Sequence, residues 1–208
     1  MKNKKNFFYN TKNKIYCFAD NLKTAELLLK GGAKIIQFRE KTLDDNIFFN
    51  TAVNILSLVK KYDDTILIIN DRVNIAIEIG ADGVHIGQED ESFDTAIQRV
   101  PKDMIVGVSA KTIEQAIKAE NTGATYLGCG AIFPSSTKKN SSVIGIDGLK
   151  NIIKAVKIPV VAIGGININN IGMLINTGAK YFAVISGINN SQDIPQALNN
   201  FIKLTRGE

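Results

Sequence analysis

The stretch that decides the fold is G-A-K-I-I-Q-F-R-E-K at residues 32–41. Glycine fits the left-handed conformation at the end of a helix, so Gly32-Ala33 predicts a helix that ends and returns to an apolar strand. The same Gly-Ala pair precedes three further apolar runs, at Gly80, Gly123 and Gly178. This repeat indicates a chain of alternating helices and strands.

Eight apolar runs of strand length alternate with helical patterns such as 43–61, 113–122 and 194–204. The expected strands are 15–19, 35–39, 66–70, 83–86, 105–109, 126–130, 160–164 and 182–186. Nearly continuous apolar strands indicate a parallel sheet covered by helices. Eight repeats favour an α/β fold closed into a single-domain (β/α)8 TIM barrel, with an open flavodoxin-like sheet as the alternative.

Composition and length predict one domain. The 208 residues are 45% apolar, and we expect residues 1–14 to form a frayed N-terminal extension and residues 15–208 to form the barrel. No run resembles a signal peptide or a membrane span, and Cys17 and Cys129 lack disulfide or zinc spacing. We therefore expect a soluble cytoplasmic protein with free thiols and no membrane partner.

The net charge of +5 permits an anionic partner. Lysines are spread over most of the expected helices, and no basic block is interleaved with aromatic residues, which argues against nucleic acid. A basic pocket for a small phosphate compound explains the charge equally well. The oligomeric state, including a homo-oligomer, is left open.

The strand at residues 35–41 carries the first candidate site. Because side chains alternate along a strand, Gln37, Arg39 and Lys41 share one face. The following T-L-D-D at residues 42–45 reads as a capping box that starts a helix, which puts Lys41 at the strand's carboxyl end. A polyanion fits this face, although a solvent-exposed polar face explains the pattern equally well.

Polar residues follow the other expected strands at the same end, where TIM barrels place their active sites. They are Asn70 and Asp71, Gln88 and Asp90, Ser109, the run P-S-S-T-K at 134–138, Gly164 and Gly165, and Ser186 and Gly187. Asp71 and Asp90 suit magnesium (Mg2+) bound together with phosphate oxygens, or else act as a helix cap and an ordinary loop acid.

Three further features of this end have two interpretations each. The polar loop 131–146 with Lys138 is either a binding loop or a surface loop. The glycine pairs after the last two strands either bind phosphate or make tight turns. His85, the single histidine, is expected to support the site from the core rather than act as a base. Two anion sites and a metal suit displacement of pyrophosphate.

Seven short motifs occur in an order that resembles the thiamine phosphate synthase (thiamine-phosphate pyrophosphorylase) family over nearly the whole chain. They are Q-F-R-E-K at 37–41, N-D-R at 70–72, H-I-G-Q-E-D at 85–90, G-V-S at 107–109, P-S-S-T-K at 134–138, A-I-G-G-I at 162–166 and V-I-S at 184–186. The resemblance implies a transferase that joins 4-amino-2-methyl-5-hydroxymethylpyrimidine diphosphate to 4-methyl-5-(2-phosphoethyl)thiazole, giving thiamine phosphate and pyrophosphate.

The resemblance also implies roles for individual residues. The pyrimidine diphosphate would contact Gln37, Arg39, Lys41, Asn70, Ser109 and Lys138, of which Arg39, Lys41, Ser109 and Lys138 would carry the catalysis. The thiazole phosphate would contact Ser135, Thr137, Gly165, Ile185 and Ser186. Asp71 and Asp90 would hold Mg2+.

Two positions depart from the family pattern. Ser135 replaces a usual threonine and keeps its hydroxyl, whereas Lys111 stands where many relatives carry histidine. A thiazole tautomerase-like isomerase would need that histidine and would not need the lysines and aspartates at the expected diphosphate site. Loss of a metal or diphosphate residue would indicate a non-catalytic precursor-binding barrel, and no such loss is visible. A sugar-phosphate epimerase would leave the acidic pair and the lysine loop without a role.

Overall fold

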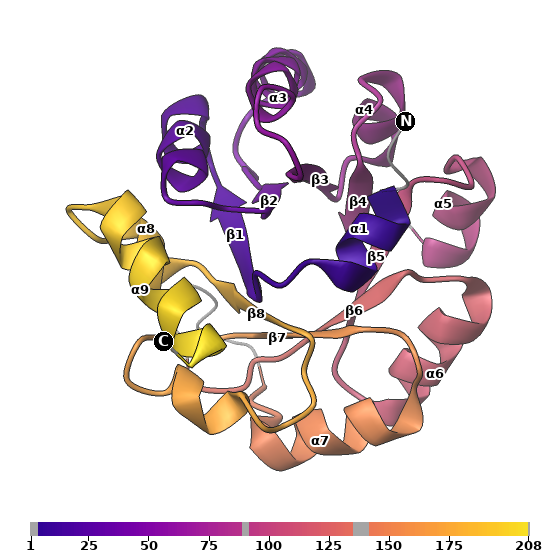
Figure 1. The fold of residues 1–208 in the computed structure, drawn as a ribbon. Helices are drawn as coiled ribbons and strands as arrows, with labels where there is room; N and C mark the ends of the chain where they lie inside the picture. Colours follow the sequence, from indigo (N-terminus) through magenta and orange to yellow (C-terminus); the bar gives the residue numbers. More distant parts are fainter. Residues whose placement is uncertain (1–3, 89–91, 135–141, 208) are drawn as a thin grey trace.

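The computed structural model describes residues 4–88, 92–134 and 142–207, in which eight parallel strands close a barrel in sequence order (Figure 1). The strands are β1 Ile15–Ala19, β2 Ile35–Phe38, β3 Ile66–Asn70, β4 Gly83–Ile86, β5 Ile105–Ala110, β6 Tyr126–Cys129, β7 Val160–Ile163 and β8 Tyr181–Val184. Pairing of Tyr16 in β1 with Ala183 in β8 closes the ring. The predicted (β/α)8 fold is confirmed, and the open-sheet alternative is wrong.

Helices surround the barrel, and every strand is followed by at least one helix (Figure 1). They are α1 Lys4–Asn10, α2 Leu22–Lys30, α3 Asp45–Val59, α4 Val73–Glu78, α5 Phe93–Arg99, α6 Ile113–Thr122, α7 Gly145–Ala155, the 3-10 helix η1 Ile171–Leu174, α8 Ser186–Asn189 and α9 Ile194–Arg206. The short η1 stands after β7, where an α-helix was expected. Asparagine side chains form hydrogen bonds with the backbone in this segment, and Asn170 Nδ2 donates to the Gly165 carbonyl at 2.9 Å. Such bonds compete with helix formation.

The Gly-Ala repeat marks the turns that it predicted. Gly32, Gly80, Gly123 and Gly178 all have positive φ, between 66° and 106°. Gly123 is the left-handed C-cap of α6, and the capping box of Thr112 and Gln115 is present at the other end of that helix. The repeat therefore reflects helices that end in a left-handed residue before a strand.

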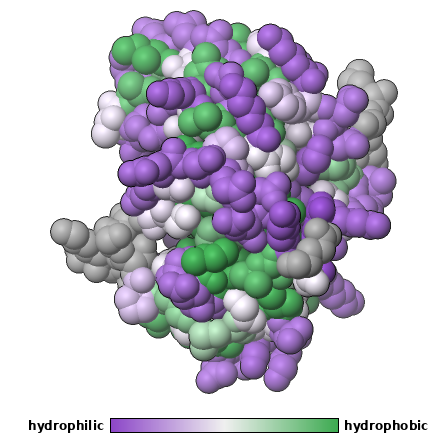
Figure 2. Space-filling model, turned by 60° about the vertical axis from the view of Figure 1, so that its left-hand side comes forward, coloured by the Kyte–Doolittle hydropathy of each residue, from purple (hydrophilic) through white to green (hydrophobic). Residues whose placement is uncertain are grey.

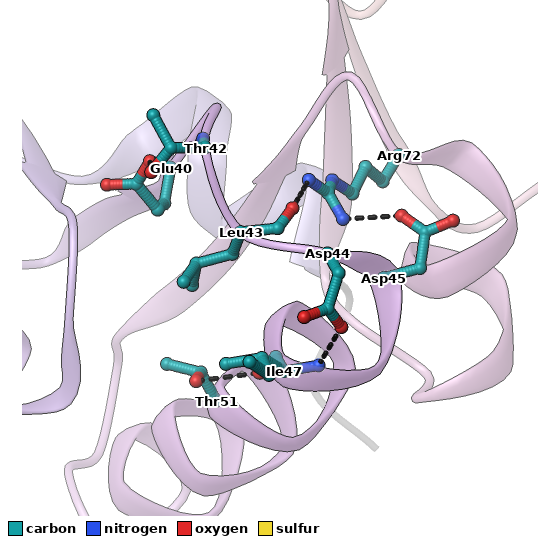
Figure 3. Close-up of polar contacts among 8 residues, drawn as sticks. All are labelled: Glu40, Thr42, Leu43, Asp44, Asp45, Ile47, Thr51 and Arg72. Carbon is teal, nitrogen blue, oxygen red and sulfur yellow. Dashed lines mark hydrogen bonds and ion pairs between the residues drawn. The ribbon is translucent and has the colours of Figure 1, made fainter.

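The predicted start of α3 was wrong. Asp44, not Thr42, is its N-cap and accepts from the Ile47 amide at 2.9 Å (Figure 3). Thr42 instead donates its hydroxyl to Glu40 at 2.7 Å. Because Glu40 already engages Thr42 in the loop, the helix begins later than the expected 43–61, and the loop that follows β2 is longer.

Two apolar layers form the core. Alternate strand residues such as Ile35 fill the barrel interior, while Ile36 and Phe38 pack outward against the helices. Figure 2 shows hydrophilic side chains over most of one face of the molecule, with apolar residues gathered below its middle and scattered singly elsewhere. None of the described helices is long and apolar enough to cross a membrane.

Helix α1 covers the amino-terminal end of the barrel (Figure 1). Phe8 is fully buried, with its ring centre 4.8 Å from that of Tyr126 and 5.0 Å from that of Tyr181. Lys4 pairs with Asp82, which directly precedes β4. The expectation of a frayed arm was wrong for residues 4–10, because a single buried aromatic side chain ties the segment to the barrel floor.

Candidate active site

A cavity of about 220 Å³ opens at the carboxyl ends of the strands. Every described residue to which the resemblance gave a substrate or metal role lines it: Gln37, Arg39, Lys41, Asn70, Asp71, Ser109, Gly165, Ile185 and Ser186. Asp90, Ser135, Thr137 and Lys138 were also assigned to the site but lie outside the described residues. The roles of the assigned residues remain predictions, while their convergence in one cavity is a property of the fold.

The β2 side of the cavity carries the amide and the two cations predicted by strand alternation. Gln37 is only 2% exposed and donates from Nε2 to the Tyr16 hydroxyl at 2.9 Å. The Arg39 amide donates to the Ala19 carbonyl at 2.9 Å, which extends the pairing of β1 and β2 to the rim. Lys41 reaches further out, with half of its side chain in solvent.

Asn70 and Asp71 form the adjoining wall. Asn70 is the last residue of β3, and Asp71 adopts a left-handed φ of 63°, which is uncommon outside glycine. The Asp71 amide donates to the His85 carbonyl at 2.8 Å, so the backbone turns at the rim. Helix α4 has Arg72 at its N-cap, so the alternative that Asp71 is the N-cap residue of this helix is wrong.

Arg72 braces the loop that carries Lys41. Its guanidinium donates to the Leu43 carbonyl and to Asp45, each at 2.5 Å (Figure 3). The same group lies 4.2 Å from the centre of the Phe48 ring, at cation–π distance. The N-D-R motif thus places an amide and a carboxylate on the cavity and uses its arginine to hold the neighbouring loop.

The β4 to β6 side holds a polar cluster beneath the rim. His85 Nε2 lies 3.0 Å from Ser109 Oγ, and His85 Nδ1 lies 2.9 Å from the Tyr126 hydroxyl. Sequence reasoning placed His85 in a supporting position but missed Tyr16 and Tyr126, which also line the cavity. Burial raises the pKa of both tyrosines, which therefore stay protonated. Strand alternation could have predicted both tyrosines, because each occupies a strand position that faces the barrel interior.

The β7 and β8 side is more apolar. Gly165 has a φ of 66°, and a Cβ there would lie 2.5 Å from the Pro134 carbonyl oxygen, so glycine is required. Ile163, Ile166 and Ile185 line this side of the cavity, and Ser186 begins α8 beside them. This side offers backbone groups and a hydroxyl next to an apolar wall.

Positive charge predominates among the described lining residues. Arg39, Lys41 and Lys111 are cationic, and Asp71 is the carboxylate among these described lining residues. A carboxylate on a polar wall suits a hard cation such as Mg2+. Among the described residues no three metal-binding side chains converge, so a cation held by Asp71 would need further oxygens from Asp90, water or a bound phosphate.

A closed (β/α)8 barrel with a cationic cavity at the carboxyl ends of its strands defines the class, a TIM-barrel protein that binds anionic small molecules. The family model described as thiamine monophosphate synthase matches residues 9–188. The chain belongs to this family.

Individual relatives agree with the family assignment. The chain is 46% identical to the thiamine-phosphate synthase of Clostridium acetobutylicum, over 88% of this chain and 87% of the relative. It is 42% identical to that of Fusobacterium nucleatum, over 88% and 89%. The solved thiamine phosphate pyrophosphorylase of Pyrococcus furiosus superposes with a TM-score of 0.87 at 35% identity, covering 94% of this chain and 96% of that one.

Proposed function

We propose that this chain is a pyrophosphate-releasing transferase of thiamine biosynthesis, joining the pyrimidine diphosphate to the thiazole phosphate to form thiamine phosphate. One observation carries the proposal: a single cavity presents the cations Arg39 and Lys41, just after β2, together with a glycine-rich wall at β7 and β8. The relatives named thiamine-phosphate synthase, which are 42–46% identical, support the same activity.

The pyrimidine diphosphate would lie on the β2 to β5 side. Gln37, Asn70 and Ser109 hold the ring, while Arg39 and Lys41 contact the diphosphate. When the carbon–oxygen bond breaks, both electrons leave with pyrophosphate, and the cations, with Lys138, offset the developing negative charge. The remaining pyrimidine methylene cation is captured by the thiazole nitrogen, whose lone pair forms the new bond.

The thiazole phosphate would lie on the β7 and β8 side. Gly165 and Ser186, with Ser135 and Thr137, bind its phosphate, and Ile185 packs against the ring. Because the two substrates approach from opposite walls, the cavity sets the distance and angle between the nitrogen and the methylene carbon. The catalytic contribution is therefore mostly positional and electrostatic.

Magnesium would be held by Asp71 and Asp90, with phosphate oxygens completing its shell. When bound, it supplies positive charge beside the leaving pyrophosphate. Asp71→Asn should raise the Mg2+ concentration needed for half-maximal rate, because it removes one anionic ligand. Asp94→Asn is the control. It removes a carboxylate that lies outside the cavity lining and pairs with the Lys118 ammonium at 2.8 Å, and it should leave that Mg2+ concentration unchanged.

The test of the function is pyrophosphate release with the pyrimidine diphosphate, the thiazole phosphate and Mg2+, each omitted in turn. Release that requires all three supports the transferase. Isomerisation of the thiazole without pyrophosphate release would favour the tautomerase, and binding without turnover would favour a precursor-binding barrel. Lys111 argues against the tautomerase, which would need a histidine at this position to transfer the proton.

The proposed setting follows from the substrates and thiols. Both substrates are small phosphorylated molecules, so the function needs neither a nucleic-acid nor a membrane partner. Cys17 and Cys129 are free and buried, as expected for a chain that works in the reducing cytoplasm. Homo-oligomerisation would be decided by sedimentation, and the function does not depend on it.

A further inference from the structure

A continuous chain of hydrogen bonds runs beneath the cavity from Gln37 to Ser109. The Gln37 amide contacts the Tyr16 hydroxyl at 2.9 Å, and Tyr16 contacts the Tyr126 hydroxyl at 2.7 Å. Tyr126 contacts His85 Nδ1 at 2.9 Å, and His85 Nε2 contacts Ser109 Oγ at 3.0 Å. The five side chains come from five strands, so the chain of bonds crosses the barrel.

The hydrogen count gives these bonds one direction. Each phenol has a single hydroxyl hydrogen, and Tyr16 already accepts one from Gln37 Nε2. The Tyr16 hydrogen is then given to Tyr126, and that of Tyr126 to His85 Nδ1. Since Nδ1 accepts, the neutral imidazole carries its hydrogen on Nε2 and donates it to Ser109 Oγ.

The opposite direction is unfavourable with the amide as it stands. If His85 Nδ1 donated to Tyr126, Tyr126 would donate to Tyr16. The Tyr16 hydroxyl, 1% exposed, would then receive two hydrogens and retain its own. Within residues 4–88, 92–134 and 142–207 its hydrogen-bond partners are Gln37 and Tyr126, so its hydrogen would have no acceptor. A buried unsatisfied donor is costly, so the amide orientation of Gln37 decides the donor direction at Ser109.

Two glycines make room for this chain of bonds. Gly107 on β5 lies in register between His85 on β4 and Tyr126 on β6, and a Cβ at Gly107 would lie 2.1 Å from the Tyr126 ring. A Cβ at Gly128 would lie 2.9 Å from the His85 ring. Any larger residue at these positions would displace a ring, so the strands are shaped around the two hydrogen-bonded side chains.

We propose that Tyr16, Tyr126 and His85 are positioning residues that form a one-directional hydrogen-bond relay between two substrate-binding groups. At one end, Gln37 keeps Oε1 as an acceptor facing the cavity. At the other, Ser109 receives a hydrogen from His85 and so directs its own hydroxyl hydrogen to the ligand. The relay presents an acceptor and a donor to a ring that carries an amino group and a ring nitrogen. This last step rests on the proposed aminopyrimidine substrate.

The direction of the relay can be read from the free protein by NMR. His85 is the only histidine, so isotope-labelled imidazole nitrogens report on this site alone. The relay predicts that Nε2 is protonated and Nδ1 is not. The opposite tautomer in the wild-type protein would overturn the relay whether or not the protein is active.

The matched variants are Tyr126→Phe and Tyr181→Phe. Both remove one hydroxyl from a ring in the barrel interior, but the Tyr181 hydroxyl donates to the Phe8 carbonyl at the other end of the barrel. Tyr126→Phe should mix the two His85 tautomers and lower kcat/KM for the pyrimidine diphosphate about tenfold, as for one lost hydrogen bond. Tyr181→Phe should change neither the tautomer nor the kinetics.

Comparing the kinetic constants of the two substrates distinguishes a positioning role of Tyr126 from a general loss of folded structure. The KM of the thiazole phosphate should stay within about twofold of wild type in Tyr126→Phe, because that substrate binds on the opposite wall. Equal losses for both substrates, or an unchanged His85 spectrum, would overturn the relay. If Tyr126→Phe fails to fold, Tyr16→Phe, which frees the Gln37 amide, must show the same selective loss. Absence of turnover in the wild type would instead contradict the proposed function, and the NMR result would still decide the relay.

Discussion

The ammonium of Lys41 lies 3.3 Å from Oδ2 of Asp71, so an ion pair joins the ends of β2 and β3 at the rim of the cavity. Half of the Lys41 side chain is exposed, and an ion pair this open contributes little to stability. Its consequence is geometric, because it holds a cation and the proposed magnesium ligand side by side before any substrate binds.

Lys41→Met tests that placement. We expect the KM of the pyrimidine diphosphate to rise about tenfold or more, because one charge-assisted contact to the diphosphate is lost. Lys30→Met removes a lysine that pairs with Glu26 at 2.7 Å on the helix surface, and it should leave KM unchanged. Equal KM values for the two variants in a steady-state assay would remove Lys41 from the site.

Lys138→Ala tests the charge on the departing pyrophosphate. We expect kcat to fall about a hundredfold, as when one transition-state donor is removed, without loss of folded protein. The neighbouring variant Lys139→Ala is the control and should keep the wild-type rate. A Lys138→Ala enzyme with wild-type kcat at saturating substrates would rule out this role.

Arg72→Lys tests the brace on the loop after β2. Lysine cannot make both 2.5 Å bonds in the same planar geometry, so the loop should loosen. The KM of the pyrimidine diphosphate should rise severalfold, and stability should fall by about 1–2 kcal/mol in denaturant titrations. Arg99→Lys is the control: Arg99 donates to Asn74 between two outer helices, and its replacement should leave KM unaffected. A rise in KM equal to that of Arg72→Lys would contradict the role of Arg72 in holding the loop.

Phe8→Ala tests the packing of helix α1 on the amino-terminal end of the barrel. Because Phe8 is fully buried between two aromatic rings, its truncation should cost about 3–5 kcal/mol of unfolding free energy. Tyr9→Phe removes only a 3.3 Å bond to the Thr125 carbonyl and should cost far less. Similar urea midpoints for Phe8→Ala and wild type would show that α1 does not pack on the barrel in solution.

The two thiols should be inert in the folded protein. Burial raises the pKa of Cys129 to about 12 and raises that of Cys17 as well, so neither forms a thiolate near neutral pH. Their reaction with a disulfide reagent at pH 8 should begin only after unfolding. Rapid labelling of native protein would contradict the packing of β1 and β6.

Local sequence patterns predicted much of the fold because strand and helix formation depend largely on neighbouring residues in the sequence. Strand 66–70 and helix 113–122 match the structure to the residue, since the strand is a continuous apolar run and the helix has an apolar period between a capping box and a glycine. The packing of Phe8 was missed because the surrounding lysines and asparagines suggested solvent, and only the closed barrel provides its aromatic partners.

The residues at the carboxyl ends of the strands were predictable from the sequence, whereas the hydrogen-bonded cluster beneath them was not. Strand parity placed Gln37 and Arg39 toward the cavity, because alternation is a property of one strand. The contact of His85 with Tyr126 depends on the register of three strands around Gly107, which no single segment encodes. The left-handed turn at Asp71 was likewise missed, because non-glycine residues rarely adopt it.

The most direct measurement is a mass balance of the complete reaction with Mg2+ and both substrates. Thiamine phosphate and pyrophosphate should form in equal amounts, each matching the pyrimidine diphosphate consumed. Consumption of the pyrimidine diphosphate without thiamine phosphate, or no consumption by folded protein that binds both substrates, would contradict the central claim.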